Sequence, residues 1–255
     1  MNKQESLSKI SKDLMLKEPF YGFFLIMLNK VWHDAIGTAA VSKNGINYQL
    51  TISEKFWEPL SDLHRIGLLK HELLHIAFNH LTTFDLFKDK KLANIAMDME
   101  INQYIDKDWL PEGGIDIDDY SDLHLKGRAG SRYYYDKLQQ LQKKKKQNGT
   151  CGCENMDKLL DAVEQGNCQI TIGMPGGGNG EKEVNMPNHP WKDFQNLPDA
   201  EKQLIEKQLQ RVLSEVKSQA EKKQGNIPGE MKGIIKIQEI VPPKFNWKNY
   251  RKKLL

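Results

Sequence analysis

Cysteine is scarce in this chain. Its 255 residues include only three cysteines, Cys151, Cys153 and Cys168. An odd, sparse set excludes the disulfide framework of small secreted proteins. Cys151 and Cys153 are closer together than the usual zinc-binding pair and have no matching second pair. We therefore expect reduced, exposed thiols on a loop, with a structural zinc as the less favoured alternative.

Long hydrophobic runs are also absent. The apolar run nearest the N-terminus, Phe20 to Leu28, has nine residues, whereas a membrane-spanning helix needs about 20. The segment before it is mostly polar, and the flanks lack the pattern of a secretory signal. The sequence therefore predicts a cytoplasmic protein with no membrane partner.

No excess of one charge stands out. The chain has 37 Lys and Arg against 34 Asp and Glu, a net charge of +3, which is not typical of a nucleic-acid-binding protein. The basic residues do cluster, at Lys143–Lys146 and at Lys248, Arg251, Lys252 and Lys253. We interpret both clusters as solvated surface and keep a nucleic-acid-associated phage or bacterial protein as an alternative.

Residues 6–32 show helical spacing of apolar side chains, and Pro19 should divide them into two helices. Residues 46–52 alternate between apolar and polar side chains, which predicts a half-buried strand. Asn44-Gly45 precedes that strand and residues 38–41 precede the turn. The pattern predicts an antiparallel hairpin.

Further helices are predicted from apolar periodicity and capping residues, over residues 62–79, 90–105, 131–141, 156–163 and 198–223. Residues 142–190 are rich in lysine and glycine, and we interpret them as a flexible insertion outside the core. A hydrophobic content of 39% fits one domain over residues 1–255, interrupted by that insertion.

The helix at residues 62–79 carries the sequence H-E-L-L-H. Two histidines four residues apart, His71 and His75, differ by about 40° around a helix axis, so both imidazoles can reach one metal ion. Glu72 lies beside them, where it can act as general base for a water molecule. The surrounding residues are apolar almost all round, and burial of three such groups would be costly without a cation.

A catalytic zinc needs a third protein ligand and one open position. Asp98 is the favoured candidate, because a carboxylate among apolar neighbours needs a cation or several donors. His80 is the alternative, but on a continuous helix it lies about 140° from His75. It can serve only if the chain turns after Asn79; otherwise it can orient a ligand or stabilise an oxyanion.

Residues 71–81 (H-E-L-L-H-I-A-F-N-H-L) and 95–102 (I-A-M-D-M-E-I-N) together resemble a family of bacterial and phage proteins described as a putative metallopeptidase domain. Segments 38–41, 133–138, 189–191 and 241–247 are similar to other family positions. The resemblance implies an α+β, zincin-like fold, mainly helical with a small sheet containing a β-hairpin, and one zinc ion per chain. Many members carry a C-terminal domain that resembles von Willebrand factor A. The family's site residues correspond here to His71, Glu72, His75, His80, Asp98 and Asn102.

Asn102 and His189 are the remaining candidates for this site. Asn102 lies one helical turn after Asp98 and on the same face, so it can fix that carboxylate. His189 either faces the site or is a turn residue before Pro190.

The predicted function is a zinc-dependent peptidase. His71, His75 and Asp98 would hold the metal, and Glu72 would move the proton of the attacking water. An extended peptide or protein substrate could add to an edge presented by the strand at residues 46–52. The alternative is a catalytically silent metal-binding scaffold or regulator that works with a partner ATPase or a von Willebrand factor A-like domain.

Overall fold

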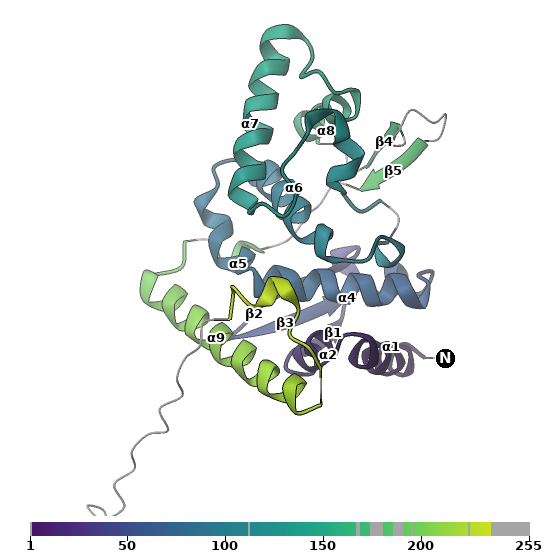
Figure 1. Ribbon diagram of the computed structural model, residues 1–255, viewed down its shortest axis with the longest axis vertical. Coiled ribbons are helices and arrows are strands. Elements are labelled where there is room, and N and C mark those ends of the chain that lie inside the picture. The colour runs from purple at the N-terminus through teal and green to yellow at the C-terminus, as the bar shows by residue number, and fades with distance from the viewer. Residues whose placement is uncertain are drawn as a thin grey trace, which may run out of the picture.

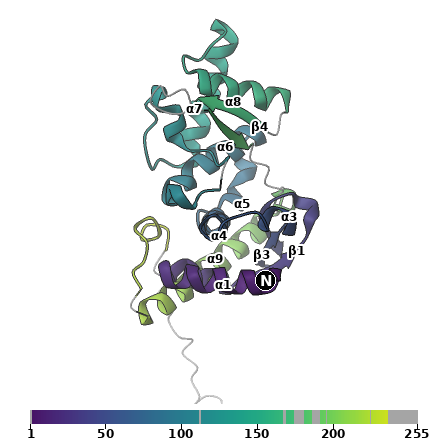
Figure 2. The same cartoon turned by 90° about the vertical axis from the view of Figure 1, so that its right-hand side faces the viewer.

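The computed structural model describes residues 2–111, 113–166, 169–173, 181–185, 191–194, 196–223 and 225–235. Helix α4 (Asp62–Ala77) runs through the middle of the molecule (Figure 1, Figure 2). On one side of it lie α6 (Lys90–Ile101), α7 (Ser131–Asn148), α8 (Glu154–Gln165) and the strand pair β4 (Gln169–Gly173) and β5 (Glu181–Asn185). On the other side lie α1 (Lys3–Lys17), α2 (Pro19–Ile26), a three-stranded sheet and α9 (Asp199–Lys222). The fold is α+β and mainly helical, as predicted.

The three-stranded sheet contains β1 (Asn29–Trp32), β2 (Ala39–Asn44) and β3 (Asn47–Ile52) in the order β1-β3-β2. Strands β2 and β3 pair antiparallel around the Asn-Gly turn, which confirms the predicted hairpin. Strand β1 pairs with β3 in parallel. Because β3 is paired on both sides, the prediction that residues 46–52 offer a free edge is wrong, and the edge strands are β1 and β2.

The N-terminal helices follow the predicted division at Pro19. Helix α1 begins with a capping box between Asn2 and Glu5, and Pro19 occupies the first turn of α2. The prediction of helix through residue 32 is wrong, because α2 ends at Ile26 and residues 29–32 form β1. A short apolar run suits either structure by itself, and here the pairing with β3 decides.

Helix α4 begins at the cap residue Ser61, whose hydroxyl accepts the His64 N–H at 3.1 Å. It ends before Asn79, which has a left-handed backbone with φ of 60°. Helix α6 begins after Asp89, whose carboxylate accepts two backbone N–H groups. Every residue of α6 from Leu92 to Ile101 is buried. Both helices are therefore fixed in the core, and α4 packs directly against α6.

The interpretation of residues 142–190 as an insertion outside the core is wrong for its described helical parts. Helix α7 continues through the lysine run to Asn148, because Lys145 and Lys146 form ion pairs with α8. Helix α8 buries five residues, which lie in the main hydrophobic core of the protein or beside it. Cys151 and Cys153 are free thiols but are buried, not exposed. Strands β4 and β5 then form an antiparallel pair.

Shorter elements complete the described chain: α3 (Glu54–Trp57), α5 (His80–Thr83), η1 (Asp34–Ile36), η2 (Phe84–Leu86), η3 (Asn102–Tyr104), η4 (Lys107–Trp109), η5 (Ile117–Leu123), η6 (Trp191–Phe194) and η7 (Gly229–Met231). In the described part of the chain, no helix has the length and apolar character needed to cross a membrane. Cys168, His189, segment 241–247 and the basic residues at 248–253 lie outside the described residues. The division into one domain stays a prediction.

Candidate metal centre

Helix α4 presents its two histidines on one buried face. The His71 and His75 ring centroids are 4.6 Å apart, and their Nε2 atoms are 3.0 Å apart. His75 has no exposed surface, and Glu72 is 2% exposed, while the His71 side chain keeps 14% of its surface. The site is therefore buried on the His75 side and reaches solvent on the His71 side.

Helix α6 brings Asp98 to the same point. Its Oδ1 atom lies 3.3 Å from His75 Nε2 and 3.8 Å from His71 Nε2. A tetrahedral zinc with bonds of about 2.0–2.1 Å holds its ligand atoms about 3.3–3.4 Å apart. The three observed separations bracket that value. These three residues form the one group in the described chain with the composition and spacing of a metal site, and they fit the ion.

A neighbouring amide determines which His71 nitrogen carries the proton. His71 Nδ1 lies 2.8 Å from Asn102 Oδ1, and Asn102 Nδ2 donates to the Ile115 carbonyl at 2.8 Å. The second bond fixes the amide so that its oxygen faces the ring, and His71 Nδ1–H is the donor. The lone pair of His71 Nε2 then points toward His75 and Asp98. The contact shown for Asn102 is thus with His71, where the sequence predicted contact with Asp98.

His80 lies behind His75 and not among the ligand atoms. The left-handed Asn79 turns the chain after α4, so that His80 Nδ1 lies 2.9 Å from His75 Nδ1. The other ring nitrogen, His80 Nε2, lies 3.1 Å from Glu100 Oε2. The chain does turn at the place where the sequence required it, but the turn brings His80 to the outer nitrogen of His75.

Strand β2 contacts the site through its backbone. Val41 N–H donates to Glu72 Oε2 at 3.0 Å, and the Val41 carbonyl accepts the Trp191 indole N–H at 3.1 Å. Trp191 also packs edge-on against His75, with ring centroids 4.9 Å apart. Both backbone groups of Val41 face away from β3 and are bonded to Glu72 and Trp191, so the outer side of β2 is tied to the metal centre at this residue.

The comparisons agree with this geometry. Residues 2–255 match the family described as "Putative metallopeptidase domain". The chain belongs to this family. No curated protein and no solved structure matches it.

Three contributors to the centre were not predicted as site residues: Glu100, Trp191 and the Val41 backbone. Glu100 stands in the same buried helix as Asp98, so its burial as a second carboxylate was a usable signal. Trp191 is separated from Val41 by 150 residues, and a backbone N–H has no signature in the sequence. The prediction for His189 falls outside the described residues and stays open.

Proposed function

We propose that this chain is a zinc-dependent peptidase with a zincin-like arrangement of its H-E-x-x-H helix and a neighbouring strand edge. The observation that carries the proposal is the convergence of His71, His75 and Asp98 within ligand distance of one another, beside the carboxylate of Glu72. Family membership supports a metal-dependent hydrolase. A purely structural zinc would not need the adjacent carboxylate.

Each residue of the site has its own role in the proposed reaction. His71, His75 and Asp98 would hold zinc, which supplies a Lewis acid that acidifies water and polarises a carbonyl. Glu72 accepts the proton of the attacking water and passes it to the leaving amine. Val41 N–H holds one carboxylate oxygen of Glu72 at 3.0 Å, which orients the other.

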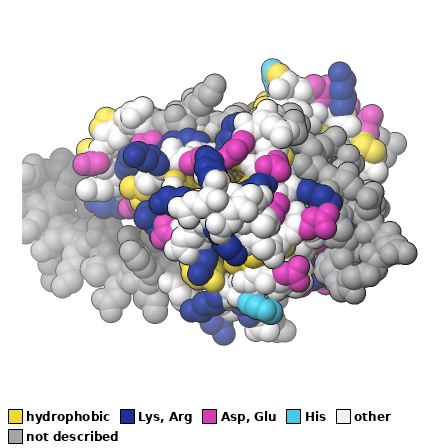
Figure 3. Space-filling model, turned by 90° about the horizontal axis from the view of Figure 1, so that it is seen from above, with side chains coloured by type: hydrophobic (Ala, Val, Ile, Leu, Met, Phe, Trp, Pro, Cys, Tyr) yellow, Lys and Arg dark blue, Asp and Glu magenta, His cyan; other side chains and the backbone are white. Residues whose placement is uncertain are grey.

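The nucleic-acid alternative finds no support in the lysine run. Lys144 donates to the Cys151 carbonyl, Lys145 pairs with Asp161, and Lys146 pairs with Glu164. The end view in Figure 3 shows basic and acidic side chains intermixed on that face. Nonspecific binding to phosphates needs an uncompensated basic surface, and two of the four lysines, Lys145 and Lys146, are already paired with carboxylates of α8.

Metal content tests the site. Protein purified without chelator should contain about one zinc per chain, and His75→Ala and Asp98→Asn should lose it. His64→Ala is the matched control, since His64 lies on the same helix about two turns before the motif, and it should keep the metal. No zinc in the wild type after adding zinc would overturn the proposal.

Hydrolysis tests the activity separately. Wild-type protein loaded with zinc is incubated with a pool of peptides derived from a proteome digest, and new termini are identified by mass spectrometry. We expect cleavage that disappears with a chelator, returns with zinc and is absent in Glu72→Gln. Stoichiometric zinc with no cleavage of peptides or unfolded proteins would favour the scaffold that works with a partner ATPase or a von Willebrand factor A-like domain.

A further inference from the structure

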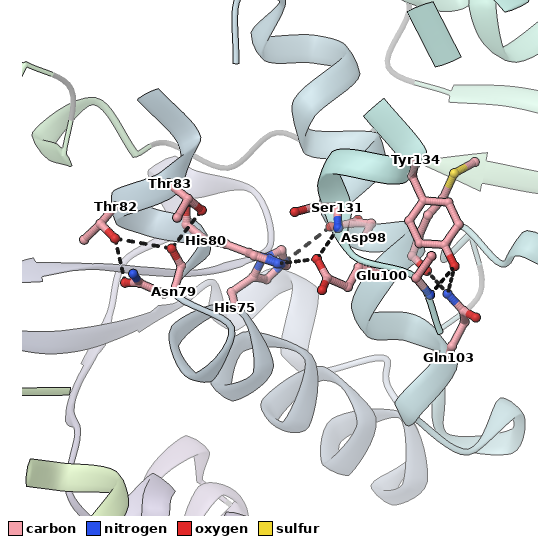
Figure 4. A network of polar contacts seen from close by, with 12 residues as sticks. His75, Asn79, His80, Thr82, Thr83, Asp98, Glu100, Gln103, Ser131 and Tyr134 are labelled. Atoms are coloured by element: carbon pink, nitrogen blue, oxygen red, sulfur yellow. Dashed lines mark hydrogen bonds and ion pairs between the residues drawn. The ribbon is translucent and has the colours of Figure 1, made fainter. Parts of the chain in front are cut away.

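We propose that His80 and Glu100 are positioning residues that hold His75, and that the N-terminus of α7 holds Glu100 in turn. The proposal rests on the proposed function, because it concerns the residue that would bind the metal at the end of α4. Figure 4 shows the four groups in one line, from His75 through His80 and Glu100 to Ser131. None of the residues beyond His75 reaches the ligand group itself.

The first step is the direction of the hydrogen bonds. His75 Nε2 faces Asp98 and His71, so its lone pair is the one available for a metal. The proton of neutral His75 then resides on Nδ1 and is donated to His80 Nδ1 at 2.9 Å. His80 must accept there, so its own proton resides on Nε2 and is donated to Glu100 Oε2 at 3.1 Å. Each bond in the line requires the next.

The second step is the end of the line. Glu100 Oε2 also accepts the backbone N–H of Ser131 at 2.6 Å, the first residue of the 18-residue helix α7. The N-terminus of a helix favours a carboxylate, through its exposed N–H groups and its dipole. Glu100 is therefore held as an acceptor, and it imposes the proton positions on both histidines. The line joins α4, α5, α6 and α7.

The third step is why His75 needs such support. It lies in the last turn of α4, two residues before the helix ends at Ala77. His71 is one turn further inside and is held by a neutral amide. A carboxylate relayed through an imidazole makes the ligand nitrogen more basic and fixes the plane of its ring. The line of hydrogen bonds through His80 and Glu100 therefore holds the His75 ring in place, although His75 lies at a helix end.

Zinc affinity is the readout, measured on the full chain by competition with a chromophoric chelator. Replacement of a residue that supports a metal ligand lowers metal affinity about 10–100-fold. We expect a loss in that range for Glu100→Gln, which keeps the size and an acceptor oxygen, and at least as large a loss for His80→Phe. Gln103→Ala is the matched control. It breaks the contacts of Gln103 with Tyr134 and Arg128 at the same α6–α7 junction and should keep wild-type affinity.

A double variant distinguishes this line from a general packing role. If Glu100 acts through His80, adding Glu100→Gln to His80→Phe should lower affinity by no more than about twofold, because coupled residues are not additive. A full second loss would overturn the line, as would an equal loss in Gln103→Ala. Cobalt-substituted protein gives a second readout, since the visible spectrum should shift in Glu100→Gln but not in Gln103→Ala. Wild-type affinity in Glu100→Gln would refute this inference alone, whereas no metal in the wild type would refute the proposed function.

Discussion

Replacing Glu72 with glutamine separates the proposed chemistry from the metal site. Glu72 is 2% exposed and accepts the Val41 N–H at 3.0 Å. Glutamine has the same size and keeps an oxygen for that hydrogen bond. We expect the free energy of unfolding to fall by only about 1 kcal/mol, the difference between hydrogen bonds to charged and to neutral acceptors. Zinc content should stay at the wild-type level.

Catalysis should respond far more strongly. A positioned general base contributes about 10²–10⁴-fold to rate, which corresponds to about 2.7–5.4 kcal/mol of activation free energy. The assay is kcat on a cleaved peptide from the proteome-derived pool, at matched metal occupancy, with unfolding followed by urea. Glu58→Gln, an exposed carboxylate nearby in the sequence, should have wild-type values. A kcat for Glu72→Gln within tenfold of wild type would refute Glu72 as the base.

Three further outcomes are expected. Chelation of the zinc-loaded protein should lower Tm by about 8–16 °C. Metal at 1,000 times Kd adds about 4.1 kcal/mol to the free energy of unfolding, and each kcal/mol shifts Tm by about 2–4 °C for a protein of this size. An unchanged Tm in calorimetry would contradict a metal that joins α4 and α6. Gly67→Ala should lower the free energy of unfolding by about 1–3 kcal/mol or more in urea titrations, because the added Cβ would lie 1.8 Å from the Trp109 carbonyl oxygen. Wild-type stability in this variant would show that the contact between α4 and Trp109 is looser than described. Burial raises the pKa of the Cys151 thiol to about 11. Alkylation of Cys151 in the folded protein should therefore be slow at pH 8 and should accelerate with each pH unit toward that value. Peptide mapping that found Cys151 alkylated at pH 8 as fast as free cysteine would contradict its burial.

Local signals in the sequence predicted much of the fold. The hairpin and helices α4 and α9 were placed to within a few residues, because caps, turn residues and apolar periodicity agree there. The predicted helix at 90–105 overran, since the chain changes to the η3 turn after Ile101. Pairing between distant segments was the part without a local signal. Strand β1 needs β3 as a partner, and the end of α7 needs the acidic side chains of α8.

The candidate site, like the fold, could be predicted from the sequence only in its local parts. The relative positions of His71, Glu72 and His75 follow from helical geometry alone, and the choice of Asp98 over His80 follows from the burial of a carboxylate. The contact of Asn102 with His71 could not be predicted, because the sequence does not show that η3 turns its amide toward that ring. The contacts of Glu72 with the β2 backbone and of Trp191 with His75 depend on tertiary packing.

The left-handed residue at the end of α4 has a consequence for recognising such centres in other chains. A continuous helix would point His80 away from His75, whereas one residue with φ of 60° at Asn79 brings the two rings together. Glycine and asparagine adopt that conformation at little cost, and β-branched residues do not. A search for this arrangement should therefore require H-E-x-x-H-x-x-x-[NG]-H and a carboxylate two positions after the aspartate that faces the histidines. A designer who transplants only the five-residue motif would leave its second histidine unsupported.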